Sequence, residues 1–255
     1  MSALWEELPP PTIGGGTGGS GTRVITEVLS EAGVFMGSRV NRSGDALPLA
    51  DFDWSWGKRY IAAELSGKKP PLRRMRRKFD ASVREHLQGY DPSTGAWGWK
   101  HPHAYLLLPW LDSLMPRLRF IHLVRDGRRV ARSKNQKQPG RYADVVFGAE
   151  AETWDEQVRA IKFWSWANEH AAEYGERHMD GRYLRARLED ICADPRGACG
   201  QLIEFAFDGS PASEDLVARA AERVKTPPQL PADDEQHAAQ VEQAGLAGLR
   251  RFGYV

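Results

Sequence analysis

The sequence TIGGGTGGSGTRVITEVLSEAG, residues 12–33, places a glycine-rich turn between a short extended segment and a helix. Six glycines fall within the eight residues from Gly14 to Gly21. Apolar side chains then recur at helical spacing, and Gly33 follows as a typical helix stop. Because the N–H groups and the dipole at a helix N-terminus attract anions, this stretch predicts a phosphate-binding loop.

The glycine pattern by itself fits several kinds of phosphate site. It matches G-x-G-x-x-G twice, at residues 14–19 and 16–21. A dinucleotide site is disfavoured, because the extended segment is short and no acidic residue ends a clear second strand about 20 residues later. The Walker pattern fails as well, since Thr22-Arg23 follows Gly21 in place of Lys-Ser/Thr. A flexible loop is the structural alternative, and the helix directly after the glycines argues against it.

Extended and helical segments alternate along the rest of the chain. The patterns predict strands at 9–13, 96–100, 118–124 and 182–188, and helices at 23–32, 53–65, 70–90, 104–114, 151–178, 199–207, 213–224 and 240–252. We expect loops at 37–53 and 137–150. This alternation predicts an α/β fold, a doubly wound, mostly parallel sheet flanked by helices, in a single domain over residues 1–255. Ligands of such sheets bind beyond the carboxyl ends of the strands.

The composition indicates a globular protein with an uneven charge. Of its 255 residues, 41% are hydrophobic and 27% charged, and the net charge is +1. Residues 1–141 hold 23 basic and 13 acidic side chains, a net of +10, whereas residues 142–255 hold 12 and 21, a net of −9. No apolar run is long enough for a membrane span, and no secretory signal is visible. Two cysteines, Cys192 and Cys199, give neither a disulfide framework nor a zinc pattern, so we expect a cytoplasmic protein without a metal site.

A second anion-binding pattern lies in FIHLVRDGRRVARS, residues 120–133. A buried strand carries Arg125 to its carboxyl end, and Ser133 follows eight residues later, within the next predicted helix. This segment resembles the 3′-phosphate motif of sulfotransferases that use 3′-phosphoadenosine 5′-phosphosulfate (PAPS). The resemblance implies that Arg125 and Ser133 bind the 3′-phosphate. His122, inside the strand, is expected in the core, and Asp126 is expected to cap the helix.

Further segments resemble the same family in the same order. GGSGTR (18–23) is similar to its 5′-phosphosulfate loop, residues 97–127 to its central strand–helix–strand, residues 183–207 to its "RYEDL" segment, and LRRFGY (249–254) to its last helix. The resemblance implies a P-loop-like sulfotransferase architecture. Two departures stand out: Gly19 replaces the lysine that many cytosolic members carry in the loop, and Leu188 replaces the tyrosine of RYEDL, which leaves Arg187 there.

The resemblance also implies roles for individual residues. The loop would bind the 5′ end of PAPS, and the cofactor-binding residues would be Gly18, Gly19, Ser20, Gly21, Thr22, Arg23, Arg125, Ser133 and Arg187. Lys100 and Arg23 would neutralise charge on the leaving phosphate. The general base stays open between His101 and Glu27, with Asp45, Asp51 and Asp53 in a segment that could line the acceptor pocket. Elements of that pocket are expected within 38–90 and 137–150.

Three functions follow from these patterns. The first is a sulfotransferase that moves a sulfuryl group from PAPS to a hydroxyl of a small molecule or glycan, releases PAP (adenosine 3′,5′-bisphosphate) and requires no metal ion or nucleic-acid partner. The second is an atypical phosphate-loop kinase or other nucleotide-binding enzyme. The third is a non-catalytic polyanion-binding protein that uses KKPPLRRMRRK, residues 68–78, although a solvated helix face explains that run as well.

Overall fold

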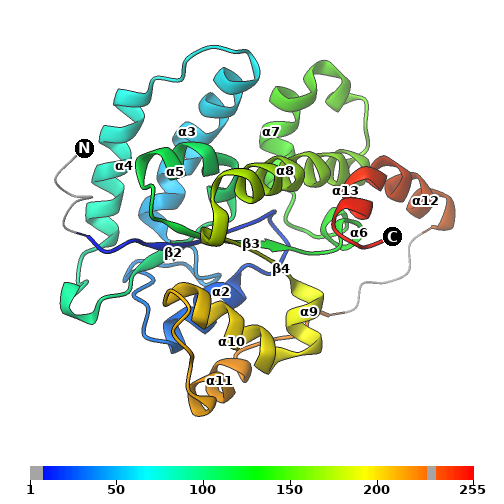
Figure 1. The fold of residues 1–255 in the computed structure, drawn as a ribbon. Helices are drawn as coiled ribbons and strands as arrows, with labels where there is room; N and C mark the ends of the chain where they lie inside the picture. The colour runs from blue at the N-terminus through cyan, green and yellow to red at the C-terminus, as the bar shows by residue number, and fades with distance from the viewer. Residues whose placement is uncertain (1–7, 229–233) are drawn as a thin grey trace.

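A parallel sheet organises the protein. The computed structural model describes residues 8–228 and 234–255 (Figure 1). Its four strands, β1 (Thr12–Gly15), β2 (Gly98–Lys100), β3 (Arg119–Val124) and β4 (Tyr183–Arg187), lie in the order β2-β1-β3-β4, and every neighbouring pair is parallel. The predicted α/β class with a parallel sheet is therefore confirmed. Because β1 lies between β2 and β3, the glycine loop leaves the sheet at its centre.

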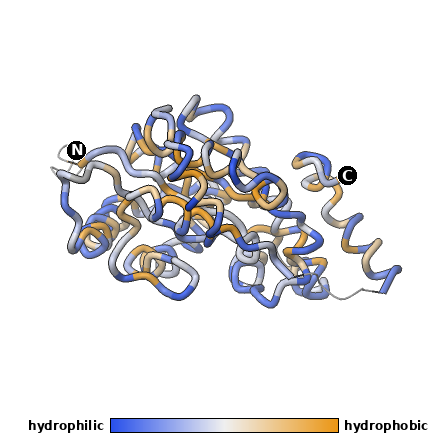
Figure 2. Tube along the Cα trace, turned by 90° about the horizontal axis from the view of Figure 1, so that it is seen from below, coloured by the Kyte–Doolittle hydropathy of each residue, from blue (hydrophilic) through white to orange (hydrophobic). Residues whose placement is uncertain are grey.

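Helices cover both faces of this sheet (Figure 1). One face carries α2 (Arg23–Glu31), α9 (Leu188–Ala193), α10 (Pro195–Ala206) and α11 (Glu214–Ala221). The other carries α3 (Leu47–Leu65), α4 (Leu72–His86), α5 (Leu108–Leu114), α6 (Gly127–Ala131), α7 (Lys137–Phe147), α8 (Glu156–His178), α12 (Glu235–Ala244) and α13 (Leu246–Arg251). Side chains alternate along β3, so that Ile121 and Leu123 pack toward α2 and α10, whereas Phe120 packs in the opposite core. Figure 2 shows the hydrophobic residues concentrated along the central strands.

The first strand begins later and runs further than predicted. Prolines 9–11 have no N–H to donate to a sheet, so pairing begins at Thr12 and continues through Gly15, beyond the predicted limit of residue 13. Both glycines of this strand are required by close packing. A Cβ at Gly14 would lie 2.9 Å from Ile25 of α2, and one at Gly15 would lie 2.9 Å from the ring of Phe120.

The structure corrects two predicted loops. Residues 47–53 belong to α3, which starts at Leu47 with Pro48 in its first turn, where a proline costs no hydrogen bond. Residues 137–147 form α7, because Gln138, Pro139, Tyr142 and Ala143 supply a buried face that a count of polar residues hides. Ser133, predicted within the helix that follows Arg125, lies instead in the loop after α6, because α6 ends at Ala131.

Smaller corrections concern helix limits. The predicted helix at 104–114 divides into a 3₁₀ segment, Pro102–Leu107, and α5, with Pro109 in the first turn of α5. The predicted helix at 240–252 is two helices, α12 and α13. The long helix α8 starts at Glu156, because Asp155 caps it by accepting from the N–H groups of Gln157 and Val158. The basic run 68–78 precedes α4 and continues into its first two turns, where Met75 is buried and most basic side chains are exposed.

Candidate active site

All four strands end at one edge of the sheet, and each ends at a predicted site residue or at the glycine loop. β2 ends at Lys100, β1 continues into the loop, Arg125 directly follows β3, and β4 ends at Arg187. Three cavities lie along this edge. They are called here the loop cavity, the Arg125 cavity and the His101 cavity.

The three cavities adjoin one another. The loop cavity, of about 340 Å³, is lined by the loop, Arg23, Glu27, Asp45, Lys100 and Lys225, among others. It shares Leu188 and Pro227 with the Arg125 cavity on one side. It shares Gly18, Asp45, Pro102 and Asn135 with the His101 cavity on the other. The site is therefore one continuous cleft with the loop in the middle.

The loop backbone needs glycine at its turns. Gly19 and Gly21 have φ values of +93° and +82°, in the left-handed region. A Cβ at Gly19 would lie 2.8 Å from the hydroxyl oxygen of Ser133, so the two anion-binding segments pack directly against each other. Arg125 adds a second link, because its guanidinium donates to the carbonyl oxygen of Gly19 over 3.0 Å. The structure thus brings Gly19 together with Arg125 and Ser133, each of which follows it by more than 100 residues in the sequence.

Ser20 and Thr22 are buried at the entrance of α2. The Ser20 N–H donates to the carbonyl oxygen of Thr17 over 3.0 Å and closes a turn, so this amide is already used. Its hydroxyl oxygen, in contrast, is buried without a hydrogen-bond partner in the described part of the chain. Buried polar atoms are rarely left in this state. Ser20 itself lines none of the three cavities, whereas its neighbours Gly19, Gly21 and Thr22 line the loop cavity.

A buried network of hydrogen bonds holds Thr17, at the start of the loop, in place. Tyr105 is hydrogen-bonded to the Thr17 hydroxyl over 3.1 Å and donates to Gln138 over 3.0 Å, and Asn168 donates to the same Thr17 hydroxyl over 2.9 Å. Asn168 in turn pairs with His122, whose other ring nitrogen pairs with the Tyr183 hydroxyl. Burial lowers the pKa of His122 to about 4, so this core histidine is neutral. The network fixes the first residues of the loop against β3, β4 and α8.

Lys100 lies in a buried ion pair. Its side chain is 1% exposed, and its ammonium group contacts Asp45 and donates to the carbonyl oxygen of Ser43 over 2.7 Å. Burial disfavours the carboxylate of Asp45, but the neighbouring Lys100 outweighs this and lowers the pKa of Asp45. The ion pair therefore places a positive charge on the floor of the loop cavity and holds it there.

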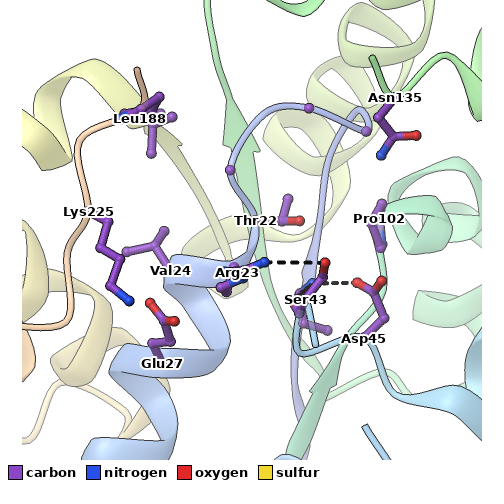
Figure 3. A pocket seen from close by; sticks show the side chains of 15 residues that line it. Thr22, Arg23, Val24, Glu27, Ser43, Asp45, Pro102, Asn135, Leu188 and Lys225 are labelled. Carbon is purple, nitrogen blue, oxygen red and sulfur yellow. Dashed lines mark hydrogen bonds and ion pairs between the residues drawn. The ribbon is translucent and has the colours of Figure 1, made fainter. Parts of the chain in front are cut away.

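Arg23 and Glu27 take different sides of this cavity. Arg23, exposed at the start of α2, reaches toward the hydroxyl of Ser43, 3.5 Å away. Figure 3 shows Ser43, Asp45 and Pro102 on one side of Arg23, and Glu27 with Lys225 on the other. Glu27 consequently lines the loop cavity but not the His101 cavity.

His101 lines the third cavity and is held by a carboxylate. Its Nδ1 atom lies 2.5 Å from Oδ2 of Asp53, and both residues are buried. Burial raises the pKa of Asp53, whereas His101 opposes that shift. The neighbouring His103 contacts Tyr142 through its own Nδ1, over 2.9 Å, and burial lowers the pKa of His103 well below its ordinary value. Of the two histidines, His101 is the one paired with an acid.

Arg125 and Arg187, both expected to bind the cofactor, lie in different surroundings. Arg125 lines its cavity with Arg129, Glu189 and Cys192. Burial lowers the pKa of its guanidinium, and an anion bound in this cavity would raise that pKa again by stabilising the charged form. Arg187 lines none of the three cavities. Its guanidinium carbon lies 4.4 Å from the centre of the Tyr254 ring, near the C-terminal end of the chain. The predicted capping role of Asp126 is confirmed, because its carboxylate accepts from the N–H of Arg128.

Several cleft residues escaped the sequence reasoning. Lys225 enters the loop cavity from the segment after α11, and Asn135 lies between the loop and His101 cavities. Ser43 positions both Lys100 and Arg23. No sequence pattern marks Lys225 or Ser43 as site residues. Asn135 could have been suspected, because it follows Ser133 by two residues.

Two general findings concern the described residues as a whole. Within residues 8–228 and 234–255, no three His, Cys, Asp or Glu side chains gather closely enough to hold a metal ion. In the same ranges, no helix combines the length and the apolar character needed to cross a membrane.

Comparison with known proteins agrees with this geometry. A model of the sulfotransferase family matches residues 16–207. No curated protein sequence matches the chain. Sulfotransferase STF1 from Mycobacterium tuberculosis H37Rv is similar in fold, with a TM-score of 0.54 and 13% identity, over 93% of this chain and 76% of that one.

Two more solved structures have TM-scores of 0.47. They are the sulfotransferase domain of the Synechococcus PCC 7002 olefin synthase (16% identity, 92% of this chain and 94% of that one) and retinol dehydratase in a complex with retinol and PAP (16%, 95% and 82%). The family model covers the loop from Gly16 onward, the cleft residues from Arg23 to Glu189, and strands β2, β3 and β4, whereas β1 directly precedes the match. This chain therefore belongs to the sulfotransferase family.

Proposed function

We propose that the protein transfers the sulfuryl group of PAPS to a hydroxyl group of a small-molecule or glycan acceptor. One observation carries the proposal: a continuous cleft runs along the carboxyl ends of the strands, with Arg125 at one end, the loop and Lys100 in the middle, and His101 at the other. This order matches the order of groups in the reaction, from the nucleotide through the sulfuryl group to the acceptor.

The residues at the nucleotide end fit an anion with two phosphate groups. Arg125 and Ser133 both lie against Gly19, where they would hold the 3′-phosphate. The 5′ end would be held by the loop residues that line the loop cavity, which are Gly18, Gly19, Gly21, Thr22 and Arg23. The unsatisfied hydroxyl of Ser20 lies within the same loop. When bound, PAPS supplies the sulfuryl group, and its nucleotide part leaves as PAP. Arg187, which stacks on Tyr254, is proposed to support the Arg125 cavity from behind rather than to touch the nucleotide.

The middle of the cleft would stabilise the transition state. Negative charge grows on the phosphate oxygen as the bond to sulfur breaks, and Lys100 and Arg23 are the cations next to the loop. Because Asp45 and Ser43 hold Lys100 in place, its charge needs little reorganisation during the reaction. No metal ion is required for this role.

The acceptor would enter by the His101 cavity and lose its proton there. Gly18 and residues 101–103 line that cavity together with residues from 41–54, inside the expected segment 38–90, and with Asn135, Lys137 and Gln138, at or just before the start of the expected segment 137–150. Of the two candidate bases, His101 lines this cavity, whereas Glu27 faces the Lys225 side of the loop cavity. The geometry therefore favours His101 as the general base.

Calorimetry with PAP tests the nucleotide end. The wild type is expected to bind PAP, and Arg125→Ala to bind it about tenfold to a hundredfold more weakly, the loss of one charge-assisted hydrogen bond. Arg117→Ala serves as the matched control, because this exposed arginine precedes β3 at the opposite edge of the sheet. Absence of PAP binding by the wild type would refute the proposal, and equal affinity in Arg125→Ala would refute the 3′-phosphate assignment.

Transfer of radiolabelled sulfate from PAPS to a panel of alcohols, phenols and sugars tests the reaction itself. We expect transfer that persists in EDTA. An atypical kinase would instead turn over ATP with magnesium, and a polyanion-binding protein would show steep salt dependence of binding without any transfer.

A further inference from the structure

The contact between His101 and Asp53 joins two segments that are 48 residues apart in the sequence and pack against each other in the same core. Asp53 lies in the second turn of α3, and His101 directly follows β2. Their side chains are nevertheless both buried, 10% and 6% exposed, and Nδ1 of His101 lies 2.5 Å from Oδ2 of Asp53. Two polar side chains buried at this distance determine each other's orientation.

A carboxylate at this position selects one tautomer of the neutral His101 ring. An ionised carboxylate can only accept hydrogen bonds, so its partner Nδ1 has to carry the proton. In a neutral imidazole the lone pair is then on Nε2. Within the described residues Nε2 has no hydrogen-bond partner, and His101 lines the cavity beside the loop. The atom left available to an acceptor hydroxyl is thus the basic one.

Other charged groups face the same cavity and bear on the proton of His101. Asp45, Asp51 of α3 and Lys137 of α7 line the His101 cavity, and Lys100 of β2 lies next to it in its ion pair with Asp45. The ring of His103 lies tilted against that of His101, with ring centres 4.8 Å apart. His103 is occupied by Tyr142 through Nδ1. Within the described residues, Asp53 is the carboxylate that contacts His101.

We propose that Asp53 is a positioning residue for the transfer reaction: it holds His101 in the Nδ1–H form, with the lone pair of Nε2 directed to the acceptor. This inference rests on the proposed function. In the step, the acceptor O–H gives its proton to Nε2 while the acceptor oxygen bonds to sulfur. The bond between sulfur and the 5′-phosphate oxygen breaks, and its electron pair leaves with PAP. Asp53 stabilises the imidazolium that forms.

Nitrogen-15 NMR of labelled histidine tests the orientation without any acceptor. Long-range proton–nitrogen correlations distinguish the Nδ1–H from the Nε2–H form, and His101→Gln identifies the His101 signals. The wild type is expected in the Nδ1–H form at a pH where His101 is neutral. Asp53→Asn is expected to shift His101 toward the Nε2–H form, because the amide can donate to Nδ1. Asp51→Asn, a change of the same kind two residues away on α3, is expected to leave the form of His101 unchanged.

Kinetics with the best acceptor of the panel provide a second readout. Asp53→Asn is expected to lower kcat by about a hundredfold or more with little change in the KM for PAPS, and Asp53→Glu to recover part of that loss. An Nε2–H form in the wild type would overturn the proposal, even if Asp53→Asn failed to fold. A wild-type kcat in the Asp53→Asn protein would overturn the proposal as well. Calorimetry with PAP on the same proteins separates the two proposals, since PAP binding depends on Arg125 and not on Asp53.

Discussion

Replacement of Gly19 by alanine tests whether the two anion-binding segments act as one site. Gly19 has a φ of +93°, and an added Cβ would lie 2.8 Å from the hydroxyl oxygen of Ser133 and 3.0 Å from its Cβ. Neither contact can be relieved by the far end of a long side chain, because serine has only these two side-chain atoms. Gly19→Ala therefore has to displace either the loop or Ser133.

The expected effect has two parts. The left-handed backbone costs an L-residue about 1–2 kcal/mol, which lowers the midpoint of thermal unfolding by roughly 2–8 °C for a chain of this size. Displacement of Ser133 and of the loop then weakens PAP binding, and a loss of about 1.4 kcal/mol would already be a tenfold loss of affinity. Gly33→Ala is the matched control. Gly33 has a φ of +83°, yet a Cβ there would meet no atom within 4 Å.

Differential scanning calorimetry and PAP titration on both variants separate the two parts. We expect similar losses of thermal stability in Gly19→Ala and Gly33→Ala, but weaker PAP binding only in Gly19→Ala. If Gly19→Ala bound PAP as tightly as Gly33→Ala does, the contact between the loop and Ser133 would have no part in nucleotide binding, and the reasoning would be wrong.

Three further predictions concern the interior of the site. Lys100→Met leaves the partly buried carboxylate of Asp45 without its cation, so urea unfolding should show a loss of about 1–3 kcal/mol, part of which Lys100→Met combined with Asp45→Asn should recover. Burial lowers the pKa of His122 to about 4, against about 6.5 in an unfolded chain. Between these values the unfolded chain binds a proton that the folded one excludes, so stability should fall by about 3 kcal/mol as the pH drops from 6.5 to 4, and less in His122→Gln. Asn168→Ala removes the donor to Thr17 and should lower the unfolding free energy by about 1–3 kcal/mol while weakening PAP binding; unchanged binding would show that the network is not needed to hold the loop.

Local patterns were sufficient for the loop and for the Arg125 segment. The strand–glycine–helix order of residues 12–31 and the strand that ends before Arg125 are properties of short stretches, and the structure confirms both. Parallel pairing then brings their carboxyl ends to one edge of the sheet, as the general rule for such sheets requires. The cleft could thus be located without knowing any long-range contact.

The pairings inside the cleft could not be predicted in this way. His101 and Asp53 are 48 residues apart, and the contact exists only because α3 begins at Leu47, in a segment predicted as loop. Likewise, Gln138 reaches the Gly16 carbonyl from α7, which the polar composition of 137–150 concealed. The two helices differ in their buried faces. In α7 the buried residues are Gln138, Pro139, Tyr142 and Ala143, which show little apolar periodicity. In α3 Leu49, Phe52, Trp56 and Ile61 do recur at helical spacing, and the predicted start of the helix falls too late because Pro48 and the acidic residues near its start resemble a loop.

The position of β1 brings basic residues of the first half of the chain to one edge of the sheet. Three strands, β1, β2 and β3, come from the half with a net charge of +10, and β1 lies between the other two. Lys100 and Arg125, only 25 residues apart in sequence, consequently flank the glycine loop from opposite sides, each at the end of a neighbouring strand. The acidic half adds β4 at the sheet edge and the helices that cover it. The exposed run 68–78, in α4 and directly before it, carries seven basic and no acidic residues, so it accounts for +7 of the +10, and it lines none of the three cavities at the strand ends. Lys100, Arg125 and Arg23 are the smaller share of the basic charge that lies where an anionic nucleotide would bind, and a net charge of +1 conceals the separation between the two halves.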